Sequence, residues 1–109
     1  MATYTPKRLY QGSPTTETTP WYTCPAATKT IVKQLVAANI TGATLTFSVS
    51  VVPSGQTAGA TNRIAGTVPV GANNTVVLDL FQVLGVGDFL SGLVSAAGLV
   101  LTISGIEQT

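Results

Sequence analysis

The chain of 109 residues is long enough for one domain with one core and too short for two. Only 8% of its residues are charged, where a typical soluble domain has roughly 25%, and its net charge is +1. The five basic residues are scattered along the chain without forming a stripe, which argues against nucleic-acid binding. Because so few charges cover the surface, we expect part of its neutral, hydroxyl-rich area to be buried against a partner.

The N-terminal segment differs in composition from the rest of the chain. Residues 1–20 are rich in Thr and Pro and carry few core-forming side chains, so they are predicted to form an extended N-terminal arm or an irregular edge. Residues 21–109 are predicted to form the folded domain. The N-terminus lacks the apolar segment of a signal peptide, so we expect synthesis in the cytoplasm.

The clearest strand of the sequence spans residues 44–52, where apolar and polar side chains alternate strictly. The preceding segment 30–38 is rich in β-branched residues and is predicted to pair with it as a hairpin through a turn at residues 39–42. Apolar residues at helical spacing give the competing interpretation for 30–38. The Thr and Val content and the missing helix caps favour a strand.

The middle of the chain alternates between loop and strand signals. Residues 53–62 have no periodicity and contain several turn-forming residues, so they are predicted to form an exposed loop. The segments 63–70 and 75–80 are predicted to be strands, the first of them near an edge because it contains a proline. Residues 81–84 are predicted to form one helical or 3₁₀ turn.

The last third of the chain is strongly apolar. Residues 88–95 and 99–107 are predicted to form a second hairpin. The stretch 89–106 has no charge and approaches the minimum length of a membrane-spanning helix. Its β-like alternation and interior hydroxyls favour strands, so no membrane span is expected. Apolar side chains expected to point outward, such as Val94 and Val100, exceed what one core can absorb and suggest an interface.

These segments together predict an all-β fold. Seven or eight short strands at regular spacing are typical of an antiparallel β-sandwich or a jelly-roll-like barrel. The aromatic residues of the N-terminal fifth can pack the arm onto this sandwich, anchor an interface or stack on sugars. These aromatic residues are Tyr4, Tyr10, Trp21 and Tyr22.

The sequence offers no set of side chains for catalysis. It contains no histidine, the commonest general base and transition-metal ligand, and Cys24 has no second cysteine or histidine for a disulfide or a zinc site. Among the four acidic residues, Asp79 is expected to face outward on a strand and Asp88 to serve a turn, so a glycosidase pair is not favoured. No phosphate-binding loop is present. We therefore expect no enzymatic activity, no cofactor and no metal site.

Six groups of short stretches spread along the chain form a recognisable set of motifs: 5–12, 30–34, 52–55 with 57–59, 74–80, 83–84 with 87–88, and 101–107. Together these stretches resemble a family of short bacteriophage and prophage virion structural proteins. The resemblance spans nearly the whole chain, and its motifs contain no catalytic residues. It implies a particle component such as a head decoration protein, a head fibre protein or a tail accessory protein. Residues 89–94 depart from the family because they are more apolar than the alternation expected there, which makes the last hairpin a candidate for burial between subunits.

The resemblance and the charge deficit lead to one set of expectations. We expect a virion protein, made in the cytoplasm of the bacterial host, that forms a homo-oligomer, with a trimer favoured, and attaches to the major capsid protein or to other virion proteins. The second hypothesis is a module that binds host-surface glycans through Trp21, Tyr22 and the loop 53–62. The residues expected at an attachment surface or interface are Lys7, Arg8, Leu9, Tyr10, Trp21, Tyr22, Phe89 and Leu93.

Overall fold

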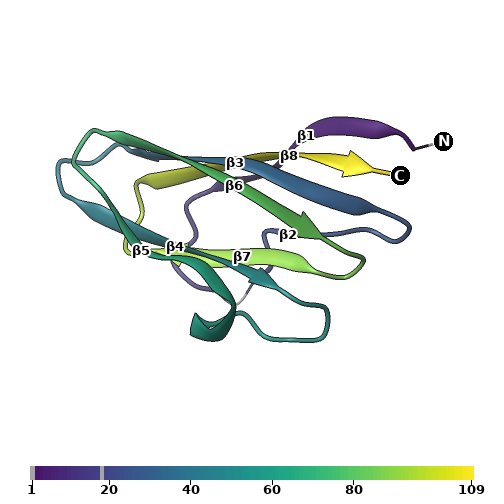
Figure 1. Cartoon of the computed structure of the whole chain (residues 1–109). Coiled ribbons are helices and arrows are strands. Elements are labelled where there is room, and N and C mark those ends of the chain that lie inside the picture. The colour runs from purple at the N-terminus through teal and green to yellow at the C-terminus, as the bar shows by residue number, and fades with distance from the viewer. Residues whose placement is uncertain (1, 18) are drawn as a thin grey trace.

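The computed structural model describes residues 2–17 and 19–109. In this part of the chain, eight strands form two antiparallel four-stranded sheets that lie face to face (Figure 1). The all-β sandwich expected from the strand pattern is thus confirmed. No helix in these two ranges has the length and apolar character needed to cross a membrane, and residues 89–106 belong to two strands and the turn between them.

The strand order is that of a jelly roll. Sheet A has the order β1-β8-β3-β6, and sheet B has the order β2-β7-β4-β5. Consecutive strands therefore cross from one sheet to the other at every connection except β4 to β5. Sheet A consists of β1 (Tyr4–Gly12), β8 (Leu99–Gln108), β3 (Lys29–Asn39) and β6 (Thr75–Leu84). Sheet B consists of β2 (Tyr22–Thr23), β7 (Phe89–Val94), β4 (Leu45–Val52) and β5 (Arg63–Val70), and a 3₁₀ turn, η1 (Ala60–Asn62), precedes β5.

Both hairpins predicted from turn signals are wrong. The segments 30–38 and 44–52 form β3 and β4, which lie in different sheets, and β7 and β8 are separated in the same way. Turn-forming residues show that the chain reverses direction. They do not show whether it returns within the same sheet or crosses to the opposite one, because that choice depends on which strands lie next to each other in space.

A buried asparagine fixes the first of these crossings. The Asn39 side chain donates from Nδ2 to the carbonyl oxygens of Ala43 and Val70, at 2.7 and 3.0 Å. Its Oδ1 accepts from the backbone amide and the hydroxyl of Thr41, at 2.9 and 2.7 Å. All four hydrogen-bonding positions of the amide are therefore satisfied, which allows it to be buried at 2% exposure.

Strand β6 is longer than expected, because residues 81–84 continue it instead of forming a helical turn. The strand bulges near Phe81, whose φ of 48° lies in the left-handed region that bulky residues rarely adopt. The pairing of β6 with β3 shifts between Val32 and Gln34 at the same level. This bulge interrupts the regular ladder at the point where the sequence was expected to leave the strand.

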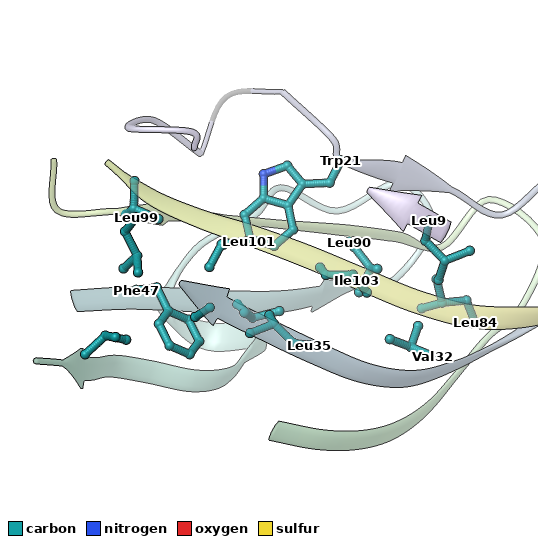
Figure 2. Close-up of a cluster of buried hydrophobic side chains, with 14 of the residues drawn as sticks. Leu9, Trp21, Val32, Leu35, Phe47, Leu84, Leu90, Leu99, Leu101 and Ile103 are labelled. Atoms are coloured by element: carbon teal, nitrogen blue, oxygen red, sulfur yellow. The ribbon is translucent and has the colours of Figure 1, made fainter. Parts of the chain in front are cut away.

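The core lies between the two sheets (Figure 2). Val94 is 1% exposed and pairs with Phe47 on the inner face of sheet B, so the expectation that it points outward is wrong. Val100 does not belong to the core and is partly exposed on β8. The large core side chains drawn and labelled in Figure 2 are Leu9, Trp21, Val32, Leu35, Phe47, Leu84, Leu90, Leu99, Leu101 and Ile103.

The N-terminal segment closes one side of the sandwich. Strand β1 pairs with β8 at the edge of sheet A and contributes Leu9 to the core. Farther along, the carbonyl oxygen of Pro14 accepts a hydrogen bond from the Val94 amide at 2.7 Å, and Glu17 forms an ion pair of 2.6 Å with Arg63. The sandwich therefore includes β1, although its sequence was assigned to the arm. Residues 1 and 18, which also fall in that expected arm, lie outside the described residues.

Candidate interaction surface

Three of the residues expected at an interface are packed inside the molecule. Leu9 and Trp21 are each 8% exposed, and both belong to the core. The ring of Tyr10 stacks on that of Trp21, with centroids 5.0 Å apart and planes 10° apart. These side chains pack the N-terminal segment onto the sandwich, which leaves no exposed indole face on which a sugar could stack.

Lys7 and Tyr22 belong to a polar cluster that links the two sheets. The Tyr22 hydroxyl is hydrogen-bonded to Thr30 Oγ1 at 2.8 Å and donates to Glu107 Oε2. The Lys7 ammonium lies 3.4 Å from Glu107 Oε1 and 5.9 Å from the centre of the Tyr22 ring. Burial raises the pKa of the Tyr22 phenol, and the hydrogen bond to Glu107 raises that pKa further. The cluster thus favours a neutral tyrosine on β2, in contact with Lys7 of β1, Thr30 of β3 and Glu107 of β8.

This cluster makes stability depend on pH in the alkaline range. An unfolded tyrosine ionises at a pKa of about 10, whereas Tyr22 keeps its proton to higher pH in the folded chain. The folded state then holds a proton that the unfolded state loses, so the free energy of unfolding should fall as the pH rises above about 10. Urea unfolding between pH 8 and pH 11 measures this slope, and Tyr22→Phe should reduce it.

A second phenylalanine substitution serves as a comparison. Burial also raises the pKa of Tyr10, so Tyr10→Phe should reduce the slope as well. Equal slopes for the wild type and Tyr22→Phe would show that the hydroxyl of Tyr22 is not held neutral by folding.

The remaining predicted residues lie on opposite sides of the sandwich. Phe89 and Leu93 are partly buried on β7, where they pair with Val52 and Ser48 of β4 in sheet B. Arg8 is exposed on β1 in sheet A. The structure therefore does not bring the eight predicted residues together into one surface.

A continuous apolar surface instead crosses the outer face of sheet A. The strand registers place Pro6 opposite Ile106, Ile106 opposite Ile31, and Ile31 opposite Val83. Directly opposite residues on neighbouring strands share a face, so these four side chains form a row across β1, β8, β3 and β6, here named the apolar row. None of them belongs to the core cluster, and Val83 is 63% exposed.

A second row, named the polar row, runs beside the apolar row. It consists of Arg8, Ser104, Gln34 and Asp79, which are opposite one another in register and all exposed. Arg8 stands at the β1 edge of the sheet and Asp79 at the β6 edge. Neither of these charges forms a salt bridge with any residue in the ranges that the structure describes.

Phe81 adds an exposed aromatic side chain at the β6 edge, between the levels of these two rows. It is 64% exposed, and the Lys33 ammonium lies 4.8 Å from its ring centre. Its left-handed backbone conformation is uncommon for a bulky residue, and such strained conformations gather at functional sites. Farther along the sheet, beyond the polar row, Val36 and Val77 form another outward apolar pair.

This face is unusual for a sandwich, whose outward positions are normally polar. The apolar residues of this face are visible in the sequence, but their alignment is not, because they are far apart in the chain. Only the strand registers bring together Pro6, Ile31, Val83 and Ile106. At one end of the sheet, Lys29, Val86 and Gln108 line a hollow of about 340 Å³. The outer face of sheet A is therefore the surface best suited to bind another protein.

The described residues contain no group of three or more His, Cys, Asp or Glu side chains positioned to hold a metal ion. Comparison of the chain with protein-family models, with curated proteins and with solved structures finds no match.

Proposed function

We propose that the protein is a non-enzymatic structural component of a tailed bacteriophage particle, of the capsid decoration or head-fibre type, which forms oligomers and attaches to the virion. The outer face of sheet A is the observation that carries this proposal. It offers a row of four apolar side chains on a sheet whose other face packs against the core. Such a surface suits lasting contact with another protein.

Two further observations support this proposal. The resemblance of the sequence to small phage virion proteins supports a bacteriophage virion as the particle to which the protein belongs. The jelly-roll order of the strands is used by viral capsid proteins, although lectin domains share it, so the fold agrees with the proposal without selecting it. A charge content of 8% also fits a protein whose surface is largely covered in an assembly.

The structure offers less support for the glycan-binding alternative. Trp21 is buried beneath Tyr10, and the hydroxyl of Tyr22 is engaged with Glu107 and Thr30. A sugar-binding platform needs an exposed aromatic face beside free polar groups. Neither aromatic residue meets this requirement in the folded chain, whereas the apolar row lies on the outer face of sheet A, with Pro6 and Val83 exposed and Ile31 and Ile106 partly exposed.

Particle association tests the proposed function. Virions released by the producing bacterium should contain the protein after purification on a density gradient, detected by mass spectrometry and by antibody labelling. Ile31→Lys places a charge in the apolar row and should lower the occupancy of the particles by roughly tenfold or more. The matched control is Thr44→Lys, which adds the same charge at an exposed residue outside the strands. Absence of the wild-type protein from the particle fraction would refute the proposal.

A further inference from the structure

We infer that the outer face of sheet A docks onto the same face of a second copy of the chain, through a two-fold axis that runs along the strands between β8 and β3. The inference rests on the proposed function in that it names the partner that covers this face. The contact itself belongs to the isolated chain and can be measured without a virion.

The sheet order determines which strands meet in such a pair. In the order β1-β8-β3-β6, an axis between the two central strands exchanges β1 with β6 and β8 with β3. When two sheets pack face to face, β1 of one copy then lies over β6 of the other. Because the axis runs along the strands, each row of side chains faces the same row of the second copy. Contacts of this kind are isologous, as in most homodimers.

The apolar row is complementary to itself in this arrangement. Pro6 of one copy lies over Val83 of the other, and Ile106 lies over Ile31. Packed sheets lie about 10 Å apart, a distance that outward Ile and Val side chains from two faces fill by interdigitation. The second copy therefore removes from water the side chains that one sandwich leaves exposed.

The polar row is also complementary to itself. Arg8 and Asp79 stand at opposite ends of this row, so the two-fold axis places Arg8 of each copy over Asp79 of the other. Two symmetric ion pairs form between charges that have no salt-bridge partner among the residues described in a single chain. A two-fold axis directed along the polar row would instead place Arg8 over Arg8 and Asp79 over Asp79. Charge complementarity thus favours a second copy of the chain as the partner that covers this face, and a two-fold axis that runs along the strands.

Charge exchange within the same chain tests this contact. Arg8→Glu and Asp79→Arg each replace two attractive pairs by two repulsive ones, and each should raise the dimer dissociation constant by at least about tenfold. The double variant with both substitutions exchanges the charges and should restore association. An equal mixture of the two single variants should form heterodimers, because Glu at position 8 of one chain then meets Arg at position 79 of the other. Light scattering after size-exclusion chromatography and sedimentation equilibrium give these masses and constants.

The control variant is Lys29→Glu, which changes the net charge by the same amount as Arg8→Glu and lies on the same face, opposite Gln108 in register. Its effect on the dissociation constant should be less than about threefold. Arg8, Lys29 and Asp79 are all exposed, and thermal unfolding of each variant verifies that the fold is retained.

The measured masses separate the outcomes. A wild-type dimer, or a hexamer built from two trimers, that dissociates in the single variants and reassociates in the double variant supports the face-to-face contact. The contact is overturned by a monomer at all concentrations, by a trimer, or by an oligomer whose dissociation constant does not change when these charges are exchanged. The proposed function is judged separately by particle association, since a monomer found in virions would refute the dimer and retain the virion role.

Discussion

Replacing Gly92 by Ala should lower the free energy of unfolding by about 3 kcal/mol or more. Gly92 lies on β7 opposite Val49 of β4, with a φ of 153°, a backbone conformation that side chains rarely adopt. A Cβ atom there would lie 2.1 Å from the carbonyl oxygen of Ser48 and 2.8 Å from the ring of Trp21. One of these contacts is with backbone, so the methyl group can be accommodated only by moving a central strand.

The matched control is Gly42→Ala, because a Cβ atom added at Gly42 meets no atom within 4 Å. Its free energy of unfolding should stay within about 0.5 kcal/mol of the wild-type value. Urea unfolding followed by tryptophan fluorescence measures both variants, since the chain has one tryptophan and it lies next to Gly92. A Gly92→Ala protein as stable as Gly42→Ala would mean that β7 and β4 are not packed as closely as the structure shows.

Strand positions were predictable from the sequence because they follow from local patterns. The alternation in residues 44–52 places Phe47 and Val49 in the core and Ser48 and Ser50 on the other face of β4, and the structure has this arrangement. The Pro-containing segment 63–70 likewise lies at the edge of its sheet. The two-residue period of side-chain direction in a strand is set by the backbone alone, so it does not depend on what the strand packs against.

The pairing of strands was not predictable in the same way. The turn after Asn39 leads into the opposite sheet, and the interactions that fix it include a hydrogen bond to Val70, which is 31 residues away. The expectation that Val94 points outward was wrong for a related reason, because the pairing of Val94 with Phe47 places it on the inner face of sheet B. Contacts between residues far apart in the chain determine these features, and such contacts cannot be read from a single sequence.

The candidate surface was only partly foreseen. The charge deficit directed attention to the protein surface, and Arg8 was among the residues singled out; burial of that surface against a partner stays a prediction. The aromatic residues Tyr10 and Trp21 were a poorer guide, because a large apolar ring serves a core as well as an interface, and here the two stack on each other. The apolar row became visible only when register aligned residues as distant as Pro6 and Ile106.

Replacing Trp21 by Ala should lower the free energy of unfolding by about 3–5 kcal/mol. The indole ring is 8% exposed, stacks on Tyr10 and approaches Gly92, so its removal leaves a cavity beside β7. The indole Nε1 is buried and has no hydrogen-bond partner among the described residues. Trp21→Phe keeps a ring in contact with Tyr10 and loses no hydrogen bond, so it should recover part of the lost stability.

The same pair of variants separates a packing role for Trp21 from a ligand-binding one. Circular dichroism during urea unfolding reports stability without depending on the tryptophan itself, and Tyr4→Ala provides the comparison for removal of an exposed aromatic ring. If Trp21 served mainly to stack on a sugar, Trp21→Ala would unfold like the Tyr4→Ala control and lose glycan binding instead. A large loss of stability, reduced in Trp21→Phe, assigns the indole to the core, because it is the packed volume of the ring that the fold requires.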